Sequence, residues 1–167
     1  MGLMDAKDIR SRIEALSKED AARKVFGASS HEYVLQPPLT EVELGATESQ
    51  FGVRFPDDYR TFLAEISSGG AGPLYGIFPL TRVNGAWRWD GDGADLVSSL
   101  REPFPHMSAW TPSIREREDE EDEDAYWRER DAWDEALYFN PHQTHGAICI
   151  CHEGCAIRDG CRSNAAA

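Results

Sequence analysis

The segment LTEVELGATESQFGVRFPDDYRTFL, residues 39–63, contains two helix signals in succession. Thr40 and Glu43 have the spacing of a capping box, in which each residue satisfies a backbone N–H of the other at a helix start. Gly52 then offers the left-handed conformation that commonly ends a helix. These signals predict a first helix over residues 41–51.

The second helix signal begins at Pro56, which suits the first turn of a helix because its missing N–H is not needed there. Four apolar residues follow at i, i+3, i+4 and i+7, namely Tyr59, Phe62, Leu63 and Ile66. That spacing predicts one apolar helix face. The Ser-Ser-Gly-Gly run at residues 67–70 ends the helix.

The chain after this helix pair has the patterns of short strands. Residues 75–80, YGIFPL, predict a strand at an edge or ending at the proline. Asn84 and Gly85 predict a hairpin turn between two short strands. A short helix is expected over residues 94–101, and residues 146–151, GAICIC, alternate like a core strand. Helices followed by strands predict an α+β domain with a mixed or antiparallel sheet packed against helices.

Residues 1–38 are interpreted as a helical extension that precedes a domain over residues 39–167. Apolar residues at helical spacing predict one buried stripe, formed by Ile9, Ile13 and Leu16. Ser17 and Asp20 indicate a short second helical turn that ends near Gly27.

Composition narrows the class of protein. With 167 residues and 41% hydrophobic content, one compact domain is expected. The sequence has neither a long apolar segment nor a secretion signal, which predicts a soluble cytoplasmic protein without a membrane contact. The formal net charge of −13 disfavours direct binding to nucleic acid and favours a basic protein partner.

The negative charge is concentrated in an insertion at about residues 114–137. Residues 116–135 carry twelve acidic and three basic side chains. Such a block is either a solvated insertion or a partner-contacting surface, and both interpretations stay open. The aromatic spacing also predicts a helical face docking on the domain, formed by Tyr126, Trp133 and Leu137. The candidate partner-binding residues are Glu118, Asp119, Glu120, Glu121, Asp122, Glu123, Asp124 and Trp127.

Trp87 and Trp89 lie two residues apart and therefore share one face of the predicted hairpin. We expect them to pack in the core. If they are exposed instead, an aromatic pair of this kind would suit an interface anchor.

The cysteines lie close to the end of the chain, at Cys149, Cys151, Cys155 and Cys161. Their spacing differs from the paired C-x2-C knuckles of zinc sites, and the nearby His142, His145 and His152 have no orienting acid at motif spacing. Strand alternation predicts that Cys149 and Cys151 share one face while Ile148 and Ile150 occupy the other. We therefore expect free thiols, with no metal, no cofactor and no catalytic residue, and so no enzyme.

Several runs of residues resemble the SUKH superfamily. They are LTEVEL at 39–44, ESQFGVRFPDDYRTFL at 48–63 and GGAGPLYGIFPL at 69–80, followed by REPFP at 101–105 and GAICICHEGC at 146–155. The resemblance implies a SUKH-like domain with a binding role. Its fold-motif positions here are Pro56, Tyr59, Leu63, Gly69, Gly70 and Gly76.

The resemblance also implies a partner. Bacterial members are mostly immunity proteins that bind and block toxins, often nucleases, whereas fungal relatives act as regulatory interaction proteins. We therefore expect an immunity protein that neutralises a cognate toxin with a basic surface, and the alternative is a regulatory or scaffold domain without a toxin. The family continues with further strands after the Gly-Cys element, whereas residues 156–167 read AIRDGCRSNAAA, so we expect a sheet that lacks its C-terminal strands.

Overall fold

The computed structural model describes residues 6–92, 94, 99–110, 116–118, 122–138, 140–154, 157–162 and 164–165. The helices in these residues are α1 (Ala6–Glu19), α2 (Ala28–His31), α3 (Glu41–Phe51), α4 (Asp57–Thr61), the π-helices η1 (Phe62–Ile66) and η2 (Asp134–Tyr138), α5 (Glu123–Trp133) and the 3-10 helix η3 (Pro141–Thr144). The strands are β1 (Val53–Arg54), β2 (Leu80–Val83), β3 (Ala86–Trp89), β4 (Ala147–Gly154), β5 (Ile157–Arg162) and β6 (Asn164–Ala165). Together they confirm the α+β class.

The predicted helix pair is present. Thr40 caps α3, since its side chain accepts from the N–H of Glu43 at 3.2 Å while its own N–H donates to the Glu43 carboxylate at 2.9 Å. Gly52 ends α3 with a φ of 68°. The second helix differs from expectation in one respect, because α4 continues as the π-helix η1, whose wider turn ends with the Ser67 N–H on the Phe62 carbonyl at 2.9 Å.

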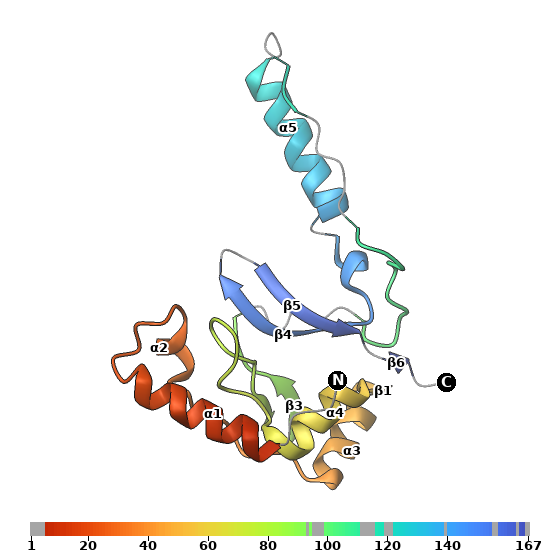
Figure 1. The fold of residues 1–167 in the computed structure, drawn as a ribbon. Helices are drawn as coiled ribbons and strands as arrows, with labels where there is room; N and C mark the ends of the chain where they lie inside the picture. The colour runs from red at the N-terminus through yellow and green to blue at the C-terminus, as the bar shows by residue number, and fades with distance from the viewer. Residues whose placement is uncertain are drawn as a thin grey trace.

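The strands form antiparallel pairs, β1 with β6, β2 with β3 and β4 with β5. Single-residue bridges place further chain segments beside β4, since Leu35 pairs with Gly70, Gly70 with Ile77 and Ile77 with Cys151 on β4. The strand predicted over residues 75–80 is reduced to this bridge, and regular pairing starts only at β2. Figure 1 shows β4 and β5 between the helical layer of α1, α3 and α4 and the distant α5.

The hairpin prediction is confirmed. Asn84 and Gly85 join β2 to β3 with φ values of 52° and 85°, the pair of left-handed residues that a type I′ turn requires. Trp87 and Trp89 on β3 are each 7% exposed and belong to the main apolar core, which confirms the core interpretation of this pair. Of the short helix predicted over residues 94–101, residues 95–98 lie outside the described residues, and residues 94 and 99–101 are not helical.

The strand over residues 146–151 is present as β4, but its expected alternation is wrong. A register shift between Cys149 and Cys151 breaks the two-residue period, so Ile148 and Cys151 are buried while Cys149 and Ile150 are half-buried. The tail also differs from expectation. It forms β5, which pairs with β4, and β6, which pairs with β1.

The main core lies between the helix pair and the strands. Its most enclosed side chains, each with at most 1% exposure, are Leu44, Phe55, Leu63, Leu80 and Ile148. An aromatic centre completes it, because Phe51 stacks on Trp89 with ring centroids 4.7 Å apart and the Trp89 indole N–H donates to the Tyr59 hydroxyl at 2.8 Å. The predicted apolar face of the second helix thus packs into this core, through Tyr59, Leu63 and the half-buried Phe62.

The stripe predicted on the first helix is not buried. Helix α1 has no buried residue, and Leu16 is 49% exposed. The reason is that α1 lies at the margin of the fold, where the Arg10 side chain donates to the Ile66 carbonyl. The second helical turn is also displaced. It forms as α2 after Gly27, because Asp20 accepts the N–H groups of Lys24 and Val25 and so closes a turn rather than starting a helix.

Helix α5 forms an arm that projects away from the sheets (Figure 1). Its neighbour among the described elements is η2, which continues it toward the body. Tyr126 is buried and Trp133 and Leu137 are half-buried, but the arm points away from α3, α4 and β4, so the prediction that this face docks on the domain is wrong. No helix in the described residues is both long enough and apolar enough to cross a membrane.

Candidate functional site

The fold-motif residues of the helix pair have structural positions. Pro56 precedes α4 as its N-cap, Leu63 is fully buried and Tyr59 is 7% exposed. Burial raises the pKa of Tyr59 far above its usual range, so its phenol stays protonated in the core. These three side chains therefore hold the fold rather than offer reactive groups.

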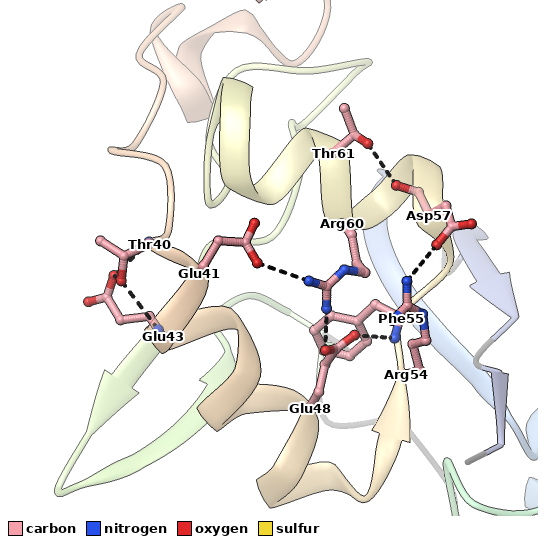
Figure 2. A network of polar contacts seen from close by, with 9 residues as sticks. All are labelled: Thr40, Glu41, Glu43, Glu48, Arg54, Phe55, Asp57, Arg60 and Thr61. Carbon is pink, nitrogen blue, oxygen red and sulfur yellow. Dashed lines mark hydrogen bonds and ion pairs between the residues drawn. The ribbon is translucent and has the colours of Figure 1, made fainter. Parts of the chain in front are cut away.

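A polar clamp joins the two helices of the pair (Figure 2). Glu48 on α3 accepts the N–H of Phe55 at 2.7 Å and forms an ion pair with Arg60 on α4. Arg60 also donates to the carboxylate of Glu41 at 3.1 Å. Glu48 is the most enclosed of these acids, with 14% of its side chain exposed. No pattern in the sequence predicted this clamp, because its partners lie on two different helices and only helix packing brings them together.

The glycine-rich motif holds three backbone segments in close contact. Gly70 has a φ of 103° and exchanges backbone hydrogen bonds with Ile77, both 2.8 Å long. Gly76 has a φ of 94°, and a Cβ there would overlap the Gly70 carbonyl oxygen. A Cβ on Gly70 would likewise overlap the Val34 carbonyl oxygen. Only residues without a side chain permit this approach.

The same glycines form part of a surface pocket, which we call the motif pocket. It has a volume of about 340 Å³, and the run GGAGPLYGIFPL contributes Gly70, Tyr75, Gly76, Ile77, Phe78 and Pro79 to its lining. The remaining lining residues come from elsewhere in the chain: Ser30, His31, Val34, Gln36, Asp90, Gly91, Asp92 and His152. The motif thus builds a concave surface as well as a fold.

The walls of the motif pocket are aromatic and acidic. His152 stacks on Tyr75 with ring centroids 4.9 Å apart, and Phe26 makes a T-shaped contact with Tyr75 at a centroid distance of 5.2 Å. Asp90 and Asp92 supply two carboxyl groups. Among the described lining residues there is no lysine or arginine, so the pocket favours a cationic group over an anionic one.

A larger pocket of about 770 Å³ shares Asp90 and Asp92 with the motif pocket. Its lining has mixed charge, since Arg88 and Arg101 also line it, and its apolar part includes the stacked pair Phe51 and Trp89. The carboxyl groups there are accompanied by arginines. This pocket therefore lacks the uniform charge of the motif pocket.

The acidic arm brings three candidate residues into the first turn of α5. The Asp122 side chain accepts the N–H of Ala125 at 2.7 Å as an N-cap, and Glu123 and Asp124 follow it. Carboxylates at this end of a helix are stabilising because the N-terminus carries partial positive charge. Trp127, one turn later, is 52% exposed, so it presents a large apolar surface beside these acids.

The other candidates in the acidic insertion divide into two groups. Glu118 is described and exposed, whereas Asp119, Glu120 and Glu121 lie outside the described residues. Residues 122–135 carry seven carboxylates and two arginines. One of these arginines, Arg130, pairs with Asp134 at 3.2 Å within the arm. The arm therefore keeps a large excess of negative charge.

The described C-terminal cysteines show neither a reactive thiolate nor a metal-binding arrangement. Cys151 is buried and Cys149 and Cys161 are half-buried, and burial raises the pKa of Cys161 to about 11, which disfavours a thiolate there. Among the described residues, no group of three histidine, cysteine or acidic side chains is arranged to hold a metal ion. Cys155 lies outside those residues.

Comparison with protein-family models matches residues 38–158 to the SMI1 / KNR4 family (SUKH-1). Neither the curated proteins nor the solved structures gave a significant match. The matched range includes the helix pair, the glycine-rich motif, the hairpin, the acidic arm and β4, which confirms the resemblance found in the sequence. Membership is consistent with an immunity-type or a regulatory domain. The chain belongs to the SMI1 / KNR4 family (SUKH-1).

Proposed function

We propose that this protein is an immunity-type binding protein that neutralises a bacterial toxin by stoichiometric binding. It would act in the cytoplasm, without a cofactor and without catalysis of its own. Family membership supports this proposal because immunity-type domains occur in the family. The observation that carries it is the projecting arm, where exposed Trp127 lies beside the carboxylates of Glu123 and Asp124.

The arm suits a protein partner with a basic surface. Its excess of carboxylates would attract such a surface over distance and so accelerate association. Trp127 adds apolar area of the kind that interface anchors use, and its indole N–H already has a polar neighbour in Glu123 at 3.4 Å. The arm would thus combine steering by charge with affinity from an aromatic anchor.

A nuclease toxin is the partner class that this chemistry favours. Nucleases bind phosphate groups through basic residues, and a helix bearing closely spaced carboxylates presents negative charge in place of phosphates. Binding of the arm across such a surface would exclude the nucleic acid. The inhibition would require one immunity protein for each toxin molecule.

The first test is growth rescue by the full chain. Cells that express the toxin domain encoded beside this gene are compared with and without co-expression of the protein, and rescue is expected. If a folded, well-expressed protein gives neither rescue nor binding to that toxin domain, the toxin assignment is overturned. The alternative is then a regulatory or scaffold domain that binds a cellular protein.

The second test distinguishes the effect of the carboxylates in the acidic insertion from the effect of the protein's overall negative charge. The variant E118Q/E123Q/D124N removes three carboxyl groups from the acidic insertion and leaves the Asp122 cap in place. A matched control, D8N/E14Q/E19Q, removes three exposed carboxyl groups from the first helical segment. Association with the toxin domain should slow by about tenfold at low salt for the arm variant, and the difference should shrink at high salt. Equal rates for both variants would contradict a role for the arm.

A further inference from the structure

The motif pocket is a second candidate binding site, formed by residues outside the arm. Its volume of about 340 Å³ lies near the lower end of the range for ligand pockets, roughly 300–1,000 Å³. That size suits one or two side chains better than a large cofactor. Its lining includes two apolar side chains, Ile77 and the 7%-exposed Phe78.

Charge selects a cation for this pocket. Asp90 and Asp92 are exposed carboxyl groups in a lining that has no lysine or arginine among its described residues. Burial lowers the pKa of His31, which keeps that imidazole neutral near pH 7. Arg88 approaches Asp90 at 3.6 Å, but both side chains are about 60% exposed, so this ion pair is weak and leaves the wall acidic.

Shape and aromatic content favour arginine over lysine. Tyr75 and His152 line the pocket and stack on each other at an interplanar angle of 23°, and a planar guanidinium stacks on the outer face of such an aromatic pair while it donates to carboxylates. A lysine ammonium is a compact, strongly hydrated charge and uses this aromatic face less well. The pocket therefore has the two elements of an arginine site, namely an aromatic face and paired acids.

The pocket has an apolar rim that points to a protein as the source of the arginine. Val34, which lines the pocket, is 52% exposed, and Phe26, which contacts Tyr75, is 61% exposed. Large apolar side chains around a polar centre are typical of protein interfaces. A free arginine would leave this rim in water, whereas a peptide segment would cover it.

We propose that the motif pocket binds an arginine side chain presented by a partner protein. The guanidinium pairs with Asp90 and Asp92 and stacks on the Tyr75–His152 pair. Apolar residues that flank the arginine in the partner cover Phe26 and Val34. The site does not require the partner to be a toxin.

The test uses small probes and the full chain, so it does not depend on the arm or on a toxin. N-acetyl-arginine-amide is titrated into isotope-labelled protein, and N-acetyl-citrulline-amide, which has nearly the same shape without the charge, serves as the control. Arginine should shift the backbone amide signals of Gly70 and Gly76, and citrulline should shift them much less. Equal shifts with both probes, or no shifts at these glycines, would overturn the proposal.

Two sets of variants locate the site. D90N/D92N removes the acid pair and should weaken arginine binding by about tenfold, which corresponds to the loss of a charge-assisted contact. S30R places a positive charge on a residue that lines the pocket and should also weaken binding, whereas S29R places it on the adjacent exposed residue outside the lining. Undiminished arginine binding by folded D90N/D92N or S30R protein, or an equal loss in S29R, would show that the pocket is not the site.

Discussion

The helix pair α3–α4 and the arm α5 are both built from capped helices with charged surfaces, yet they differ in what surrounds them. The helix pair is fastened from within by the enclosed Phe55 and by the clamp of Glu48 and Arg60. The arm has Tyr126 as its only buried residue among those described in α5, and its Arg130–Asp134 ion pair joins α5 only to η2, which directly follows it. Similar helix-capping signals therefore give a helix packed into the core in the helix pair and a projecting helix in the arm.

This contrast indicates that the helix pair contributes mainly to stability, whereas the arm is available for binding. Residues in the helix pair contact other elements, so substitutions there act on folding as a whole. Residues in the arm contact mainly each other, so substitutions there act on a local helix and on whatever it binds. Matched aromatic and acidic substitutions in the two regions test this separation.

The largest difference is expected for aromatic truncation. Phe55→Ala should lower the free energy of unfolding by about 3–5 kcal/mol, because it removes a fully buried ring and leaves a cavity in the core. Trp127→Ala should change it by less than about 0.5 kcal/mol, because that side chain is half exposed on the arm. Urea unfolding of both variants measures the two values. A comparable loss in the two variants would mean that the arm belongs to the cooperative core.

A smaller difference is expected for the two ion pairs. Glu48→Ala should cost about 1–3 kcal/mol, since it leaves the Phe55 N–H without its acceptor and removes one of the two carboxylates that pair with Arg60. Asp134→Ala removes the partner of Arg130 within the arm and should cost about 0.5 kcal/mol or less. Chemical denaturation again reports the change. If Glu48→Ala costs no more than Asp134→Ala, the clamp does not fasten the helix pair.

The smallest effect concerns pH. Hydrogen bonds from the backbone N–H and hydroxyl of Thr40 lower the pKa of Glu43 below its ordinary value of 4.5. A lowered carboxyl pKa contributes stability above pH 4.5, and that contribution is lost as the pH falls through the lower folded value. Because Glu43 is at the surface, we expect only about 0.5 kcal/mol or less.

Glu43→Gln tests this pH dependence, because glutamine keeps a carbonyl acceptor for Thr40 but does not titrate. The loss of stability between pH 5 and the acid limit, followed by urea unfolding, should be slightly shallower in this variant. Glu65→Gln removes another exposed carboxyl group from the helix pair and serves as the control. Identical acid limbs for Glu43→Gln and the unsubstituted protein would contradict the assignment.

Local codes in the sequence predicted the helix pair and the hairpin correctly. The capping box at Thr40, the glycine at 52 and the Asn84-Gly85 turn act through neighbouring residues only, so no tertiary information was needed. The acidic insertion was also evident from composition. Its projection away from the body was not, because whether a helix face is covered depends on other elements.

The errors have the same origin. The stripe on α1 was expected to be buried because its spacing is helical, but spacing does not say whether another surface lies against it. The alternation of β4 failed at one register shift, which depends on how β5 pairs with it. The candidate sites likewise depend on tertiary neighbours that local spacing does not predict. The motif glycines were found in the sequence, but their role in a pocket was missed.

By itself, the sequence determined the start and end of the central helices, the hairpin turn, the family and the place of the acidic charge, because each depends on residues that are close along the chain. Only the tertiary structure decided that Glu48 reaches Arg60, that α5 projects as an arm, and that Asp90 and His152 meet the glycine-rich motif in one pocket. These arrangements join residues that are distant in sequence. Packing of the whole chain brings these residues together, and no local sequence pattern predicts such contacts.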